Sequence, residues 1–319
     1  MQKIVALFFM SLIIYSCKND IDNKVDLSNV DVSFALKRFD VDFYNNSAKN
    51  LQELKKEYPV LFPKNVHDSV WNSKKINTDE QELFQETQKI FNNIEELKAN
   101  LTSFFKHVKY YNPKFKSPNV ITMLTNIDYD SRVVYVDSLL LISLDAYLGK
   151  NHKFYGDYPE YIKVNNHKGR VVVDVARNLV NKQILGKMPR TFIGKMINKG
   201  KKMFVLDSYL PDVLNEYKIG YAEEKYKWAV ANEEQIWQYF IEKNLLFSTD
   251  KNLDRRFLEV APFSKFYMEE DNRSPGRIGE WIGWQIVKAY MRNNDVSLHE
   301  LIRTDEETIF KKSKYKPRR

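Results

Sequence analysis

Residues Val171–Leu185 read VVVDVARNLVNKQIL, and this stretch decides the fold that the sequence predicts. It begins with three β-branched residues, which favour a strand. It continues with Ala176, Leu179 and Val180 at the spacing of a helix that buries one face. A strand that leads into a buried helix is where a zinc peptidase carries the motif H-E-x-x-H. The stretch therefore predicts the frame of such a site, and its polar residues decide whether the chemistry is present.

The polar residues of this frame are Arg177, Asn178 and Asn181, so both histidines and the glutamate of the zinc motif are missing. Arginine only donates hydrogen bonds, and amide oxygens are poor zinc ligands. Two interpretations stay open. Either this is a residual cleft that has lost its metal, or it is an ordinary core helix whose polar groups are satisfied within the fold. Both interpretations exclude zinc hydrolysis at this helix.

The chain begins with the pattern of an export signal, predicted over residues 1–16. Lys3 supplies the positive charge, and the apolar run Ile4–Tyr15 is too short to span a bilayer. Ser16 precedes Cys17, the only cysteine in the chain, which resembles the lipobox of bacterial lipoproteins. We therefore expect signal cleavage before Cys17 and lipidation of Cys17, the alternative being a plain signal peptide with a chance cysteine. A lone cysteine excludes an intrachain disulfide.

The remainder divides into a polar tether over residues 17–30 and one globular domain over residues 31–319, with a basic tail from about residue 311. Aromatic residues make up 14% of the chain, which is typical of a packed domain, and the ten glycines disfavour an all-β fold. The expected fold class is α+β, mainly helical with a small sheet, and a degenerate zincin-like scaffold is one form that it could take.

Local patterns place the elements of this domain. Apolar residues recur every three or four positions from Leu83 to Val108, which predicts one helix of about seven turns. Pairs with capping-box spacing are Thr78/Gln81, Ser297/Glu300 and Thr304/Glu307. Strands are expected at 32–43, 120–125, 132–136 and 138–146, and later helices at 191–203, 223–230, 233–246 and 277–291.

Few residues carry a recognisable chemistry. No two of the five histidines lie three or four positions apart, so we expect no metal and no cofactor. Gly276 and Arg277 open a helix and form a candidate anion site, since free amides attract negative charge there. The alternative is a helix start that only requires glycine. Glu280 lies beside Trp281 and Trp284, which would raise its pKa, unless it is simply a paired glutamate in the first helical turn.

The formal net charge of +8 is scattered along the chain and shows no basic-aromatic pattern, so we expect no nucleic-acid partner. Anionic lipid headgroups or cell-wall polymers are better candidates. The basic tail is expected to be a solvated end.

Several segments, in order along the chain, resemble the GldB family of gliding-motility lipoproteins of Bacteroidetes. They are Lys37–Asp40, Glu57–Pro59, Leu61–Pro63, Ile127–Tyr129, Asp145–Gly149, Ala261–Tyr267 and Ser274–Val287. The resemblance implies a lipid-anchored protein of the cell envelope, on the inner or outer membrane, with its domain outside the cytoplasm. It also implies a palmitate-bearing, non-catalytic component of the gliding apparatus, whose partners are other gliding or secretion proteins.

That family in turn looks distantly like gluzincin zinc peptidases, in which a later glutamate supplies the third ligand. The matching position here is Ile219, so the resemblance implies a pseudoenzyme and no catalytic activity. The alternative is an envelope hydrolase, a peptidase or cell-wall enzyme, whose catalytic groups are not recognisable from the sequence.

Overall fold

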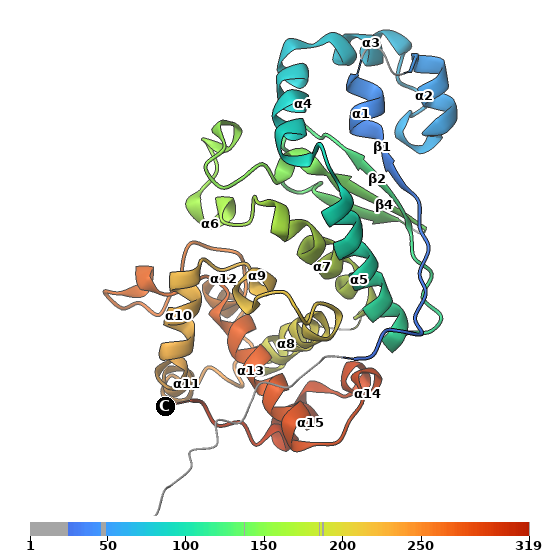
Figure 1. Cartoon of the computed structure of the whole chain (residues 1–319). Helices are drawn as coiled ribbons and strands as arrows, with labels where there is room; N and C mark the ends of the chain where they lie inside the picture. Colours follow the sequence, from blue (N-terminus) through green and yellow to red (C-terminus); the bar gives the residue numbers. More distant parts are fainter. Residues whose placement is uncertain (1–24, 46–48, 137, 185, 187, 319) are drawn as a thin grey trace, which may run out of the picture.

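The computed structural model describes residues 25–45, 49–136, 138–184, 186 and 188–318 (Figure 1). This part of the chain is mainly helical with one small mixed sheet. Its helices are α1 Phe39–Tyr44, α2 Leu51–Glu57, α3 Asp68–Ile76, α4 Thr78–Phe91, α5 Glu95–Tyr111, α6 Glu160–Lys163, α7 Val171–Gln183, α8 Phe192–Tyr209, α9 Asn215–Ile219, α10 Glu223–Ala231, α11 Glu233–Glu242, α12 Asn252–Phe257, α13 Ile278–Asn293, α14 Leu298–Arg303 and α15 Glu306–Ser313. The expected α+β class is thus confirmed.

The sheet has the order β1-β2-β4-β3. β1 is Leu36–Arg38, β2 is Asn119–Met123, β3 is Val133–Val136 and β4 is Leu139–Ser143. β1, β2 and β4 run parallel, and β3 pairs with β4 as an antiparallel edge strand. Three of the four expected strands are present within a few residues of their predicted bounds. The expected strand at 32–43 is wrong for most of its length, because the chain turns into α1 at Phe39 and buries the aromatic rings of that helix.

The stretch that opened the sequence analysis is helical throughout, so the predicted strand at its start is wrong. Val171, Val172 and Val173 form the first turn of α7 and are buried in the core. Tertiary burial overrides their strand preference, since all of these positions face packed neighbours. α7 contacts both the edge strand β3 and α8, and Figure 1 shows it between the sheet and α8. Nothing in this arrangement supports a zincin-like scaffold, in which a strand leads directly into the site helix.

The single long helix expected from Leu83 to Val108 is also wrong, because the structure divides it into α4 and α5 around Asn92–Ile94. The side chain of Asn93 accepts a hydrogen bond from the amide of Glu95 and so competes with the helical pattern at this point. The spacing of apolar residues continues unchanged from α4 to α5, so this spacing gives no sign that the helix ends between them.

Helix caps agree with expectation in one case and shift by one residue in two. Ser297 and Glu300 form the predicted capping box of α14. The caps of α4 and α15 are Asn77 and Asp305, each one residue away from the predicted threonine. Both are stronger capping residues than threonine, which accounts for the shift.

Among the described residues, the crossing of α8 and α13 is the most extensive contact between helices. Gly200 and Gly283 allow the two backbones to touch. A Cβ atom on Gly283 would lie 1.8 Å from the carbonyl oxygen of Met196, and one on Gly200 would lie 2.2 Å from the carbonyl of Gly283. The buried apolar side chains of the described residues form one contiguous core around this crossing and the sheet.

Candidate functional site

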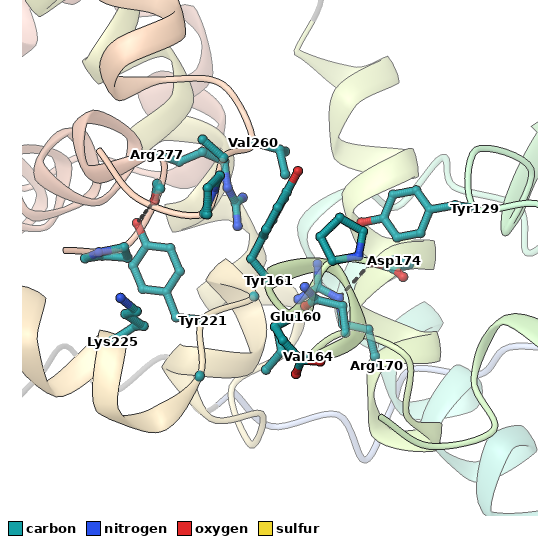
Figure 2. Close-up of a pocket in the computed structure, with 18 of the residues that line it drawn as sticks. Tyr129, Glu160, Tyr161, Val164, Arg170, Asp174, Tyr221, Lys225, Val260 and Arg277 are labelled. Atoms are coloured by element: carbon teal, nitrogen blue, oxygen red, sulfur yellow. Dashed lines mark hydrogen bonds and ion pairs between the residues drawn. The ribbon is translucent and has the colours of Figure 1, made fainter. Parts of the chain in front are cut away.

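A pocket of about 790 Å³ opens between α7, the turn that joins α9 to α10, and the loop that leads into α13. We call it the arginine pocket, because four arginines line it: Arg132, Arg170, Arg177 and Arg277. Figure 2 shows Arg170, Asp174 and Tyr129 on one side of the pocket and Arg277, Tyr221 and Lys225 on the other. Tyr161 of α6 lies between the two groups.

The first charged group in the pocket is centred on Asp174 of α7. Arg170, one turn earlier, donates from Nε to Asp174 Oδ1 at 2.8 Å, and Arg132 lies 3.2 Å from Oδ2. The Tyr147 hydroxyl also donates to Oδ2, at 3.0 Å. Burial would raise the pKa of Asp174, but the charges of Arg170 and Arg132 outweigh burial and lower the pKa below its ordinary 3.8. Asp174 is therefore ionised at neutral pH.

The second charged group is centred on Glu280, in the first turn of α13. Arg177 donates from Nη2 to Glu280 Oε1 at 2.8 Å, and Arg277 Nη1 lies 3.3 Å from Oε2. Glu280 is 3% exposed. Burial would raise its pKa, but the charges of Arg177 and Arg277 prevail and lower the pKa to about 2. The sequence had suggested that the tryptophans beside Glu280 raise its pKa. They do not, because both oxygens of the Glu280 carboxylate are paired with an arginine.

Of the four residues predicted to form a residual cleft, three line the pocket and Ile219 does not. Arg177 and Asn178 line it and are half-buried, while Asn181 lies at its edge and is exposed. Asn181 accepts a hydrogen bond from Lys202 Nζ at 3.0 Å. Ile219 is fully buried in the core and does not line the pocket, although its carbonyl accepts a hydrogen bond from Arg277 Nη2.

Asn178 has a structural contact that the sequence did not reveal. Its amide donates to the carbonyl oxygen of Val133 at 3.1 Å, and Lys182, one turn later, donates to the carbonyl of Tyr135. These carbonyls point away from β4, because the neighbouring Arg132 carbonyl accepts the bond from the amide of Ser143. α7 thus satisfies the outer edge of β3, where an extended peptide would otherwise pair.

The predicted anion site at the start of α13 is arranged differently from the expectation. Arg277 is the N-cap residue in the left-handed conformation, with φ of 58°. The first helical amide, that of Ile278, donates to Ser264 Oγ at 3.2 Å and is not directed at the pocket. Gly276 is required by packing, since a Cβ atom there would lie 2.1 Å from the carbonyl oxygen of Ala261. It is the side chain of Arg277, and not the helix amides, that faces the pocket.

Sequence reasoning missed Arg132, Arg170 and Asp174. A signal for two of them was present, because positions 170, 174, 177, 178 and 181 recur at helical spacing and form one polar face. Treating Val171–Val173 as a strand concealed this face. Arg132 could not be found locally, since it follows a turn 42 residues before Asp174.

The next question is whether side chains in the described part of the chain are grouped to bind a metal ion. Within it, no group of three or more histidine, cysteine, aspartate or glutamate side chains is placed to hold one. Asp174 and Glu280 are each paired with two arginines, which compete with any cation.

Fold and pocket together define a class: a mainly helical α+β protein with an arginine-lined pocket. The family described as "Gliding motility protein GldB" matches the chain over residues 20–317, and the chain belongs to this family. The family resemblance expected from the sequence is therefore confirmed, and membership implies a component of gliding motility. No curated protein and no solved structure matches the chain significantly.

None of the helices in the described residues is both long and apolar enough to cross a membrane. Cys17 and the predicted signal lie outside the described residues, so lipidation stays a prediction.

Proposed function

We propose that this chain is a lipid-anchored, non-catalytic component of the gliding apparatus in the cell envelope, and that the arginine pocket is its ligand-binding site. Cys17 is the proposed point of attachment, through lipid, to the inner or outer membrane. Its partners are other envelope proteins of gliding and of the associated secretion machinery.

The observation that carries the non-catalytic proposal is the pairing of Asp174 and Glu280, the two carboxylates in contact with the pocket arginines, with two arginines each. A general acid or base works best with a pKa near the operating pH. Asp174 and Glu280 have pKa values below their ordinary range and remain ionised at neutral pH. Such groups hold arginines in position and exchange no protons near pH 7.

The alternative, an envelope hydrolase, is favoured by one observation. The pocket is open, and its volume of about 790 Å³ lies within the range of small-molecule sites. Incubation of the purified protein with peptide and cell-wall substrates tests this alternative. Turnover by wild type that disappears in Glu280→Gln would replace the binding role with a catalytic one.

Anchoring is tested by Cys17→Ser, with Ser16→Ala as the matched control that keeps a small residue before the cysteine. We expect metabolic labelling with a palmitate analogue to mark wild type and Ser16→Ala but not Cys17→Ser, and colony spreading to fail in Cys17→Ser alone. A labelled Cys17→Ser protein, or normal spreading without label, would contradict the lipid anchor. A pull-down of the tagged chain from envelope extracts then identifies partners.

A further inference from the structure

The arginine pocket carries more positive charge than its own carboxylates neutralise. Four guanidinium groups line it, and Asp174 and Glu280 supply two negative charges, which leaves an excess of two. The arginine side chains are only 6–25% exposed. Charges in so sheltered a place are costly without a counter-charge.

The rim of the pocket lowers this excess by one charge but does not remove it. Lys150 and Glu160 pair with each other at 3.5 Å, and Lys225 donates to the carbonyl of Ser274 at 3.2 Å. Asp130 and Glu224 are exposed at the mouth. The rim thus has two lysines and three carboxylates, so the positive excess is concentrated on the floor and negative charge surrounds the entrance.

One geometric feature of the floor favours the binding of an anion. Nη1 of Arg132 is buried and makes no hydrogen bond within the described residues, although it lies 3.2 Å from Asp174. Lys202, which does not line the pocket and donates to Asn181, agrees with this, because burial and the charges of Lys199 and Arg177 lower its pKa despite the attraction of Glu280. A buried guanidinium nitrogen whose ion pair does not form a hydrogen bond gains an acceptor when an oxyanion binds.

The charge count and the walls together limit the ligand. The carboxylates at the mouth repel a polyanion. A polyanion would also carry more negative charge than the two excess positive charges on the floor can neutralise. Beside the arginines, the lining supplies the rings of Tyr161 and Tyr221 and the apolar segment 260–263, which suit an uncharged body. The pocket volume of about 790 Å³ accommodates a small organic molecule or the end of a polymer chain.

We infer that the arginine pocket binds a small organic anion of one or two negative charges, with a carboxylate or phosphate-monoester head at Arg132, Arg177 and Arg277 and an apolar or aromatic body against Tyr161 and Tyr221. Planar guanidinium groups pair with either oxyanion through two parallel hydrogen bonds. This inference rests on the proposed binding role of the pocket and adds the chemical class of its ligand.

The test is titration calorimetry on the full chain purified in detergent at low chloride. The probes are N-acetylphenylalanine, its uncharged amide, phenyl phosphate, acetate and inorganic phosphate. We expect at least one of the two anions that carry a ring to bind, the amide to bind at least tenfold more weakly, and the ringless anions to bind more weakly than their counterparts. The carboxylate and phosphate probes distinguish the two sources of the oxyanion. Equal binding of the amide, or no binding by either charged aromatic probe, would overturn the inference.

Variants locate the binding. Arg177→Gln should weaken the charged aromatic probes at least tenfold, whereas Arg255→Gln, which removes an exposed arginine of α12 outside the pocket, should leave them unchanged. Tyr161→Ala keeps every pocket charge and serves if Arg177→Gln fails to fold. It should weaken the charged aromatic probe that wild type binds, but not the ringless anion with the same charged group. Equal weakening by Arg177→Gln and Arg255→Gln would refute the location. So would a Tyr161→Ala protein that binds this charged aromatic probe as tightly as wild type does.

Binding in solution and spreading of colonies are separate measurements, so the two proposals fail separately. If the protein binds no anion but still requires its lipid for gliding, only the inference about the ligand's chemical class fails, and the gliding role stands. Anion binding by a protein that turns out to hydrolyse a substrate removes the non-catalytic role and leaves the charge recognition in place.

Discussion

Glu280→Gln tests the central electrostatic arrangement of the pocket. The substitution keeps the size of a side chain that is 3% exposed but removes the charge that holds Arg177 and Arg277. The pKa of Glu280 is lowered from 4.5 to about 2, a shift that corresponds to about 3 kcal/mol of stability. Removing one partner from a buried ion pair has a comparable effect, about 3–5 kcal/mol. We expect the free energy of unfolding at pH 7, measured with urea, to fall by about 3 kcal/mol.

The pH dependence of this loss has a definite sign. Because the folded-state pKa of Glu280 is depressed, its contribution is fully present above the unfolded pKa of 4.5 and disappears as the pH falls through about 2. The difference between wild type and Glu280→Gln should therefore shrink to about 1.5 kcal/mol at pH 3. Urea unfolding curves of both proteins at pH 7 and pH 3 measure this change.

Glu233→Gln is the matched control. Glu233 is also 3% exposed, but burial raises its pKa, and the hydroxyl of Tyr315 donates to it at 2.8 Å. A carboxyl group with a raised pKa contributes to the stability of the folded state at low pH, and this contribution is lost as the pH rises. Removing the charge of Glu233 at pH 7 should therefore not destabilise the protein. The reasoning is refuted if Glu280→Gln loses less than about 1 kcal/mol, the effect of an average substitution, or if its loss is the same at both pH values.

Three further outcomes are expected. Purified mature protein should contain no stoichiometric zinc by elemental analysis, and a value near one zinc per chain would contradict the absence of a metal site. Asn178→Ala should lower the unfolding free energy by about 1–3 kcal/mol, because the carbonyl of Val133 loses its donor, whereas exposed Asn181→Ala should change it by less than about 0.5 kcal/mol. Loss of spreading in either variant at normal stability and abundance would instead indicate a functional contact. Gly283→Ala should destabilise by about 3 kcal/mol or more, since its Cβ would meet Met196 at 1.8 Å, although alanine usually favours a helix, and a wild-type melt would disprove the close crossing.

Local patterns in the sequence predicted the parts of the fold that depend on neighbouring residues. The β-branched runs gave β2, β3 and β4 nearly where they occur, and Ser297 with Glu300 marked the start of α14. Such signals are visible because backbone conformation responds to side chains a few positions away. The family-specific segments likewise indicated GldB membership, which the match over residues 20–317 confirms.

Local patterns failed where a distant neighbour decides the outcome. Val171–Val173 have the composition of a strand, yet packing in the core makes them helical. The apolar period from Leu83 to Val108 runs through a break that Asn93 stabilises with its own side chain. In each case a weak local preference yields to burial or to a competing hydrogen bond, and neither appears in the periodicity.

By itself, the sequence determined that Arg177, Asn178 and Asn181 could not bind zinc, because residue types alone fix that chemistry. Only the tertiary structure decided what these residues do. Arg177 meets Glu280 across 103 positions of sequence, and Asn178 reaches the carbonyl of Val133 across 45. The sequence pattern carries no trace of such pairs, since charges far apart in the chain become partners only when the crossing of α8 and α13 and the packing of α7 bring them within hydrogen-bond distance and remove the water between them.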